Sequence, residues 1–547
     1  MTPRPRRRPS VQKITVILGV AVTSGLLAPQ IIQSAASSPA PTTSTERLAP
    51  DPRPNVVVIM TDDMRQSDLR WMPKTRRLLA NQGARFTHSF APYPLCCPAR
   101  ASFLSGQYTH NHGVWSHREP FGFASFDDDS TLPVWLHDAG YNTAFLGKYL
   151  NGYGVQSLPG GRSSVRYIPP GWTDWRGAIG GGLPRSHPKN GGVHRYFDTT
   201  LNVNGTFEGH QGEYQTKVLG DESVNIVKTY ARRDAPFFLW ANYVAPHKGS
   251  PVERDDPRNI RRRDGRISKI VTPAVPARVR GRFNDRIRKP AGLPTERDVS
   301  DKPWFIRQLP RINRSERQAM VEAARQRAEA LSVVDSQVAR TVATLRDAGE
   351  LRKTYVMFTS DNGFFEGEHR IRQGKTLPYE PSLRTPLLVR GPGVPRGVVR
   401  TAPFLSIDFA PTILRVAGAG LPSSIDGQSG LDEARHGGTW RRPVLTETGG
   451  RSSVAGATEA GAKLAVPAAP AAAANEPYTV GVRTSRYLFV RHLSGERELY
   501  DMRRDPRQLN NVAGRAAYAA DQRRMNRVLQ DLRECAGDAC RRPLSSW

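Results

Sequence analysis

The sequence predicts an α/β fold in which a large, mostly parallel sheet is flanked by helices. Two observations support this class: short apolar runs end in polar residues, and segments with helical spacing lie between those runs. The length of 547 residues allows a large core and a second, smaller domain. With 38% hydrophobic and 24% charged residues, the chain is typical of globular proteins, which excludes a disordered or membrane-embedded protein.

Five apolar runs are the predicted strands. In chain order they are Val56–Met60, the run in "YNTAFLGK" that ends at Gly147 and Lys148, Phe237–Ala241, the run in "KTYVMFTSDN", and "PLLVRG". The polar residues that follow these runs are Asp62 and Asp63, Lys148, His247, and Asp361 with Asn362. Sites in α/β sheets lie at the carboxyl ends of the strands, so these residues are candidates for one common site.

The clearest predicted helix lies in "SERQAMVEAARQRAEALSVVDSQVARTVATLRDAGEL". Its apolar residues Leu331, Val334, Val338, Val342 and Leu345 recur every three or four positions, and Gly349 offers a C-cap. Two segments break the alternation of strands and helices. Residues 254–310 are rich in Arg and Pro and predict a long basic excursion on the surface, and residues 452–475 predict a mobile Ala/Gly/Pro loop.

The expected domains are a catalytic domain at 55–401 and a smaller α+β domain at 402–547. The latter contains two predicted strands with a turn between Glu476 and Ala513, followed by a final helix. In "ECAGDAC", near the end of the chain, Cys535 and Cys540 are close enough in sequence for a small disulfide loop, the simplest arrangement in an exported protein.

The N-terminus predicts export. A basic stretch precedes an apolar run at residues 14–28 and small residues near 34–36, which is the layout of a secretory signal. The apolar run is shorter than the about 20 residues of a spanning helix, and if residues 1–36 are not cleaved they would tether the protein to a membrane. Residues 37–54 predict a flexible linker. The expected location is secreted or in the cell envelope.

The net charge of +29 favours an anionic partner. A nucleic acid, an anionic surface, or a sulfated or phosphorylated ligand would each satisfy it. The sequence contains no zinc-finger, basic-zipper or RNA-recognition signature, so nucleic acid is not the expected partner.

The acidic strand ends predict a metal site. If the strands before Asp62–Asp63 and Asp361–Asn362 are neighbours, three carboxylates and an amide converge, and their charges repel unless a cation lies among them. Hard oxygen ligands favour Ca²⁺ or Mg²⁺ over Zn²⁺. The alternative is that each pair caps a helix or a turn, as these residues often do.

Cys96 and Cys97 are adjacent, and a disulfide between them would be strained. Pro98 fits the first turn of a helix that also contains Arg100. A helix N-terminus and an arginine both favour the thiolate, which makes Cys96 a candidate reactive thiol. The alternative is a buried structural thiol.

The stretch resembles the signature of the type I sulfatases, Cys-x-Pro-x-Arg followed by Leu-(Thr/Ser)-Gly. It reads Cys96-Cys97-Pro98-Ala99-Arg100 and then Leu104-Ser105-Gly106. Further segments similar to the family are "VVVIMTDDMR", "SDNGFFEGEHRIRQGKTLPYEPSLRTPLLVRGPG" and "ELYDMRRDPRQLNNVA", so that the resemblance covers about residues 55–513. It implies an alkaline-phosphatase-like fold and an enzymatic oxidation of Cys96 to formylglycine (3-oxoalanine).

The resemblance also implies the roles of individual residues. Asp62, Asp63, Asp361, Asn362 and the modified Cys96 would hold a divalent cation, calcium or alternatively magnesium. The hydrated aldehyde at Cys96 would attack the sulfur of a sulfate ester, helped by Arg100, Lys148, His247 and Lys375. His247 or Lys375 would protonate the leaving oxygen. His110, His112 and His369 lie near the motifs and are secondary candidates for the pocket.

Two positions depart from the family pattern. Ala99 replaces the more common serine of the signature, and Leu150 occupies a position where the family often has a histidine. The stretch is most similar to the N-acetylglucosamine-6-sulfatase and extracellular heparan endosulfatase branch, which implies sulfated sugars or glycosaminoglycans as substrates, with aryl sulfates as further substrates.

The expected function is therefore an exported sulfatase that depends on a formylglycine-generating enzyme for its maturation. Two alternatives stay open from the sequence. A phosphomonoester or phosphodiester hydrolase would use a similar site for a tetrahedral anion. A non-catalytic polyanion-binding protein would account for the positive net charge without any catalysis.

Overall fold

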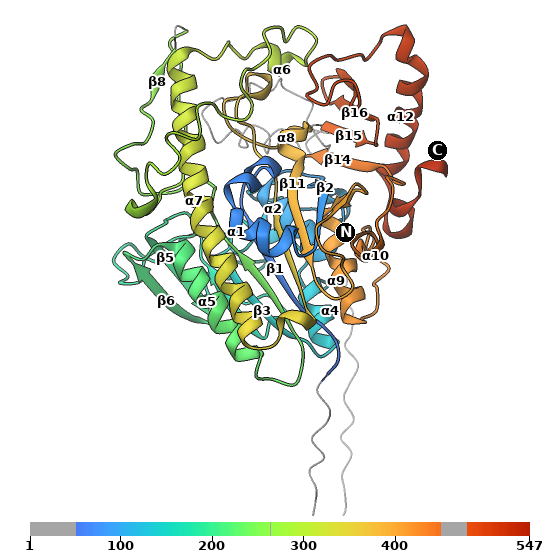
Figure 1. Ribbon diagram of the computed structural model, residues 1–547. Coiled ribbons are helices and arrows are strands. Elements are labelled where there is room, and N and C mark those ends of the chain that lie inside the picture. The colour runs from blue at the N-terminus through green and yellow to red at the C-terminus, as the bar shows by residue number, and fades with distance from the viewer. Residues whose placement is uncertain (1–50, 263, 450–478, 547) are drawn as a thin grey trace, which may run out of the picture. The chain divides into compact units, whose positions relative to one another are not determined.

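The computed structural model describes residues 51–262, 264–449 and 479–546 (Figure 1). The expected signal segment, nearly all of the expected linker, and the predicted loop at 452–475 lie outside these residues. Residues from Pro50 onward belong to one compact unit. Within the described ranges, no helix has both the length and the apolar character needed to cross a membrane.

The main sheet carries the site. Among the described residues it has 11 strands, in the order β12 (Val398–Arg400), β2 (Ala84–Phe90), β11 (Arg384–Arg390), β10 (Thr354–Ser360), β1 (Asn55–Thr61), β7 (Phe237–Asn242), β3 (Asn142–Lys148), β4 (Asp174–Ala178), β5 (Asp198–Val203) and β6 (Thr206–Gln211), with β13 (Phe404–Leu405) paired to β2. The five central strands β10, β1, β7, β3 and β4 are parallel. The outer pairs β10–β11, β11–β2, β4–β5 and β5–β6 are antiparallel. The predicted α/β class with a mostly parallel sheet is confirmed.

Strand β1 is buried on both faces, which explains its unbroken run of apolar residues. On one face, Val56, Val58 and Met60 pack in a core with helices α2 (Cys96–Ser105), α4 (Leu132–Asp138) and α9 (Phe409–Ala417). On the other face, Val57 and Ile59 pack in a core with α5 (Gln215–Tyr230) and α7 (Arg314–Asp347). Figure 1 shows α5 and α7 side by side along the sheet.

Helix α7 has the length and the buried stripe that the sequence predicts. The five apolar residues of its stripe are each at most 2% exposed. Asn313 caps its N-terminus and forms a reciprocal capping box with Glu316. Gly349 lies one residue beyond the C-cap Ala348, with φ +78°, and its N–H donates to Arg346 O at 3.0 Å. This left-handed position explains why a glycine ends the helix.

The Arg/Pro-rich segment 254–310 is irregular, as predicted, but it is not a surface excursion throughout. Its described residues, all but 263, form the short strands β8 (Ile260–Arg261) and β9 (Ile267–Ser268), the short helix η4 (Ala277–Val279) and helix α6 (Trp304–Arg307). Phe283 and Ile287 pack on the α7 residues Ala324 and Ala328 in a small separate core. The expectation of a solvated segment was wrong there because isolated apolar residues anchor the chain between exposed arginines.

A second, antiparallel sheet forms near the C-terminus from β14 (Val444–Thr448), β15 (Thr479–Arg483), β16 (Tyr487–His492) and β17 (Arg497–Asp501). The sequence predicted two strands after residue 476, and the structure has three, because Arg497–Asp501 forms its own strand after the turn at Gly495. Helix α12 (Ala519–Leu532), the predicted final helix, packs on this sheet. Strand β13 and helix α9 lie beyond the expected boundary at 402 and pack with the main sheet.

The remaining helices are short. Among the described residues they include α1 (Pro73–Thr75), α3 (Thr109–His112), α8 (Glu380–Leu383) and α10 (Leu431–His436), together with short helices such as η1 (Gln66–Trp71) and η10 (Gly537–Arg541). Cys535 and Cys540 are joined by a disulfide, which closes a loop that includes the start of η10.

Candidate active site

Four parallel strand ends bring the candidate residues together. Strands β1 and β10 are hydrogen-bonded neighbours in register from Asn55–Thr354 to Thr61–Ser360. The residues that follow them therefore emerge at the same edge of the sheet. Asp63 adopts φ +62°, a left-handed conformation that an aspartate tolerates better than most residues, directly after β1.

The acidic residues form a close, buried cluster. Asp63 N donates to Asp361 Oδ1 at 3.2 Å, and Asn362 Nδ2 donates to Asp63 Oδ1 at 2.7 Å. One atom from each of Asp62, Asp63, Asp361 and the Cys96 thiol lies within 4.8 Å of the others. All four residues are at most 2% exposed. Such a concentration of carboxylates away from water requires compensating positive charge.

Cys96 is the first residue of helix α2, with Leu95 as its N-cap and Pro98 in the first turn. Its Sγ donates to Asp62 Oδ1 at 3.2 Å and accepts from Lys375 Nζ at 2.8 Å. Cys97 instead points to the carbonyl oxygen of Asn151 at 3.7 Å. Of the two free thiols, only Cys96 faces the cluster.

Burial acts against the thiolate that the helix N-terminus and Arg100 were expected to favour at Cys96. Complete burial, together with the charges of Asp361 and Asp62, raises the pKa of the Cys96 thiol well above its ordinary value. These effects outweigh Lys148 and Lys375, which act in the opposite direction. In the unmodified side chain these contacts favour the neutral thiol over the thiolate.

Arg100 lies one turn further along α2 and is completely buried. Its Nε donates to Asp361 Oδ2 at 2.9 Å, and its Nη1 donates to the carbonyl oxygen of Lys148 at 2.7 Å and to Asn242 Oδ1 at 3.0 Å. Burial opposes its charge, but Asp361 and Asp62 prevail and raise the pKa of Arg100. Arg100 thus links the ends of β10, β3 and β7.

Two lysines complete the balance of charge. Lys148, the last residue of β3, forms an ion pair with Asp62, and Lys375 Nζ lies 2.5 Å from Asp63 Oδ1. Burial favours a neutral Asp62, but Lys148 and the other nearby cations hold the pKa of Asp62 well below its ordinary value. By contrast, burial and the charge of Asp62 raise the pKa of Asp361 despite its contact with Arg100.

His247 follows β7 and is 2% exposed. Its Nδ1 lies 2.8 Å from the carbonyl oxygen of Lys248, and its Nε2 lies 3.8 Å from Asp63 Oδ2. Because a carbonyl can only accept, Nδ1 carries a hydrogen and Nε2 is directed at the cluster. The ring of His194 stacks on the ring of His247, with 4.7 Å between their centroids.

The three secondary histidines have partners elsewhere. His110 contacts Glu447 and the carbonyl oxygen of Cys535, each at 2.8 Å. His112 Nε2 lies 3.0 Å from Ser102 Oγ, and His369 Nδ1 lies 2.7 Å from Glu296 Oε1. Leu150 is part of the hydrophobic core.

Sequence reasoning missed Asn242, His194 and Arg327. Asn242 directly follows the third predicted strand and is the last residue of β7, and that position was the available signal. Arg327 Nη2 donates to the carbonyl oxygen of Asp63 at 2.6 Å, but an arginine within a long amphipathic helix gives no sign of this contact.

The donor set fits a hard divalent cation. Three carboxylates and one amide lie together, and Asn362 Oδ1 is a buried acceptor without a hydrogen-bond partner. Orphaned buried oxygens of this kind are costly unless a cation or another donor meets them. Oxygen donors of this chemistry suit Ca²⁺ or Mg²⁺.

The comparisons with known proteins agree with this geometry. A sequence model described as Sulfatase matches residues 54–419. An arylsulfatase of Volvox carteri is 31% identical over 521 residues, covering 90% of this chain and 76% of the relative. An N-acetylglucosamine-6-sulfatase of Capra hircus is 30% identical over 528 residues, covering 90% and 85%.

A solved structure described as a complex with its substrate D-glucosamine-2-N,6-O-disulfate has the same fold, with a TM-score of 0.65 and 24% identity over 89% of this chain and 98% of that one. The expected alkaline-phosphatase-like fold is thereby confirmed. From the match over most of its length, the chain belongs to the sulfatase family and is a sulfuric ester hydrolase.

Proposed function

We propose that the protein is an exported sulfatase that hydrolyses sulfate esters of sulfated sugars or glycosaminoglycans, and also of aryl alcohols, with formylglycine derived from Cys96 and a calcium ion. The observation that carries the proposal is the position of Cys96, which begins α2 between Asp62 and Lys375. A thiol with a raised pKa is a poor nucleophile there, whereas an oxygen group at the same position would face both the acidic cluster and the cations.

Asp62, Asp63, Asp361, Asn362 and the modified Cys96 would hold the cation, which is calcium or alternatively magnesium. When bound, it would supply a positive charge that acidifies the attacking hydroxyl and polarises the ester. Conversion of Cys96 would supply a hydrated aldehyde, with one hydroxyl to attack sulfur and a second to expel sulfate afterwards.

The protein's own side chains would stabilise the hydrated aldehyde at residue 96 and neutralise the charge on the sulfate. Arg100, held by Asp361 and by the carbonyl oxygen of Lys148, has a fixed guanidinium beside residue 96 and would stabilise the hydrated aldehyde. Lys148 and Lys375 lie on two sides of the cluster and would neutralise the charge that develops on the sulfate oxygens.

The leaving oxygen needs a proton, and His247 or Lys375 would donate it. The contact of His247 Nδ1 with the carbonyl oxygen of Lys248 leaves Nε2 as the atom that holds and transfers a proton. Lys375 Nζ is the alternative donor, because it already contacts Cys96 Sγ at 2.8 Å. The N-terminal segment supports export and offers a tether if it is retained, and maturation would require a formylglycine-generating enzyme.

Mass spectrometry of the peptide that contains residue 96 tests the proposal. Conversion of the thiol to an aldehyde lowers the peptide mass by about 18 Da, the difference between H₂S and O. Turnover of an aryl sulfate should track the converted fraction across preparations. Full activity in protein that carries only an unmodified Cys96 thiol would refute the proposed nucleophile.

A further inference from the structure

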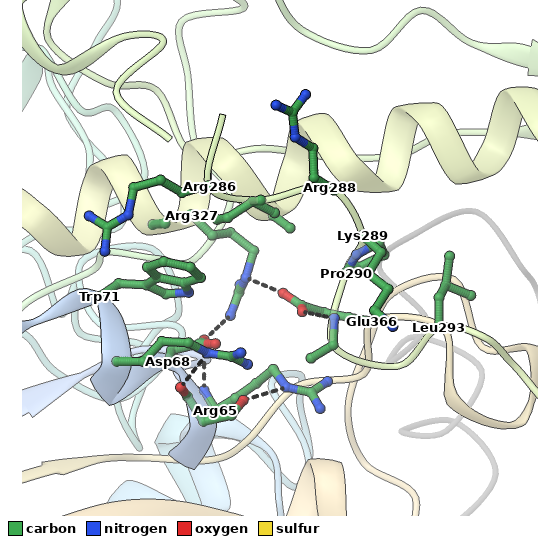
Figure 2. Close-up of a pocket in the computed structure, with 16 residues that line it drawn as sticks. Arg65, Asp68, Trp71, Arg286, Arg288, Lys289, Pro290, Leu293, Arg327 and Glu366 are labelled. Carbon is green, nitrogen blue, oxygen red and sulfur yellow. Dashed lines mark hydrogen bonds and ion pairs between the residues drawn. The ribbon is translucent and has the colours of Figure 1, made fainter. Parts of the chain in front are cut away.

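A cavity of about 540 Å³ lies beside the acidic cluster of Asp62, Asp63 and Asp361, and none of the roles proposed for the sulfatase reaction uses it. Its wall consists of the segment from Arg65 to Trp71, the segment from Arg286 to Leu293, and one face of α7 (Figure 2). Among the described residues that line it, none is a member of the acidic cluster. Its volume lies in the range of small-ligand sites, about 300–1,000 Å³.

The floor of the cavity consists of paired charges. Arg327 donates to Glu366 Oε1 at 3.1 Å and to Asp68 Oδ2 at 3.4 Å. Arg65, which also lines the cavity, donates to Glu368 Oε1 at 2.6 Å, a carboxylate outside the lining. Figure 2 shows the Arg327 side chain turned toward Glu366 and Asp68, with Arg65 beside Asp68. The floor therefore offers carboxylate acceptors as well as arginine donors and carries little net charge.

The rim of the cavity is basic and aromatic. Arg70, Arg286, Arg288 and Lys289 line it and are exposed, and the lining also includes the half-buried indole of Trp71. The guanidinium groups of Arg70 and Arg286 lie 5.3 and 5.5 Å from the ring centroid of Trp71. Arg288, which points outward in Figure 2, is 72% exposed. Four cations at an open rim attract an anion that can still reach the floor.

We propose that this cavity binds a sulfated saccharide unit of the polymeric substrate, as a subsite separate from the acidic cluster. The inference rests on the proposed function, because it assigns a substrate to the same enzyme. Sulfate or carboxylate groups of the unit contact the rim cations, and sugar hydroxyls donate to Asp68 and Glu366 while accepting from the floor arginines. The combination of carboxylate acceptors below and cations above suits a ligand that carries both hydroxyls and anionic groups.

The charge pattern favours a saccharide over a nucleic acid. A phosphodiester backbone presents acceptors to the protein, and the acceptors Asp68 and Glu366 on the floor would repel it. One side chain that lines the cavity also contacts the acidic cluster, because Arg327 donates to the carbonyl oxygen of Asp63 at 2.6 Å. A polymer that occupies the cavity thus lies against the segment that carries the proposed metal ligands.

The test compares two triple variants of equal charge. The cavity variant combines Arg286→Ala, Arg288→Ala and Lys289→Ala. The control combines Arg523→Ala, Arg524→Ala and Arg527→Ala, three exposed arginines on α12. Both are made in the full chain with Cys96→Ala, so that binding of a heparin octasaccharide is measured by calorimetry without turnover.

We expect the cavity variant to bind the octasaccharide about tenfold more weakly than the control, since each exposed ion contact contributes about 0.2–1 kcal/mol. Equal affinity of the two variants overturns the inference. The assignment to a saccharide is overturned if a single-stranded DNA octamer binds as tightly and loses as much affinity in the cavity variant.

The same triple changes in the Cys96 enzyme give the kinetic test. The ratio of kcat/KM for the sulfated oligosaccharide to kcat/KM for a small aryl sulfate should fall about tenfold in the cavity variant and stay constant in the control. An unchanged ratio with normal aryl sulfate turnover refutes the subsite alone. A wild-type protein that binds the octasaccharide at this cavity but hydrolyses no sulfate ester refutes the proposed function and leaves the cavity assignment standing.

Discussion

Arg100→Met should destabilise the protein through a single buried ion pair. The guanidinium is completely buried, and the methionine removes its contacts with Asp361, with the carbonyl oxygen of Lys148 and with Asn242. Asp361 then lacks the cation that hydrogen-bonds to it. Breaking a buried pair by removing one partner costs about 3–5 kcal/mol, because the remaining charge is left uncompensated.

That cost converts into a shift of the melting temperature. Unfolding entropy is about 2.1 cal/mol/K per residue, which gives about 1 kcal/mol/K for a chain of this size. A loss of 3–5 kcal/mol therefore lowers the Tm by about 3–5 °C. Calcium should reduce this deficit, because a cation among the carboxylates compensates the charge of Asp361 that Arg100 no longer balances.

Differential scanning calorimetry of wild type, Arg100→Met and the exposed control Arg527→Met, each with chelator and with calcium, measures the effect. The control should lie within about 1 °C of wild type, as expected for a substitution on the surface. If the Tm of Arg100→Met in chelator equals that of the control, the buried ion pair contributes nothing to stability and the reasoning fails. If calcium leaves the deficit unchanged, the carboxylates do not bind the ion.

Further outcomes are expected. Chelation should reduce aryl sulfate turnover, and calcium should restore it better than zinc; turnover that persists in chelator would argue against the metal site. Cys96→Ala should abolish turnover, and aryl sulfate should be preferred over aryl phosphate, so a strong preference for phosphate would contradict the sulfatase assignment. Burial opposes the charge of His110, but Glu447 raises the pKa of His110 to about 9. The pKa of His110 in the unfolded chain is about 6.5, so its protonated form contributes about 3 kcal/mol to the free energy of unfolding. This contribution is complete below pH 6.5 and is lost as the pH rises through 9. Measured by denaturant unfolding, the free energy of unfolding of His110→Gln should not show this decline with pH. If it declines as steeply as that of wild type, His110 is excluded as the source.

Much of the fold was predictable because the spacing of apolar residues along the sequence matches the faces that are buried in the tertiary structure. Val56–Met60 is apolar throughout because β1 is covered on both faces, and the stripe of α7 has helical spacing because one side packs on the sheet. The segment 254–310 was misread because its apolar residues, Phe283 and Ile287 among them, are isolated between arginines and form no helix or strand of their own.

The positions of site residues that directly follow strands were predictable. Contacts made to the site by residues far away in sequence were not. Asp62 and Asp361 meet because parallel strands align their carboxyl ends. Arg327 reaches the carbonyl oxygen of Asp63 across 264 residues, and no local pattern records that contact. Burial of Cys96 reversed the effect expected from the helix N-terminus, because desolvation depends on the packing of the whole domain.

The complete burial of Cys96 has a consequence for how the enzyme is made. Under the proposed function a converting enzyme has to reach residue 96, whose side chain is 0% exposed in the folded chain, so conversion is expected before this part of the chain closes. A production host that lacks the converting activity should yield well-folded but inert protein. Adding the activity to that purified material should not rescue it unless the chain is first unfolded.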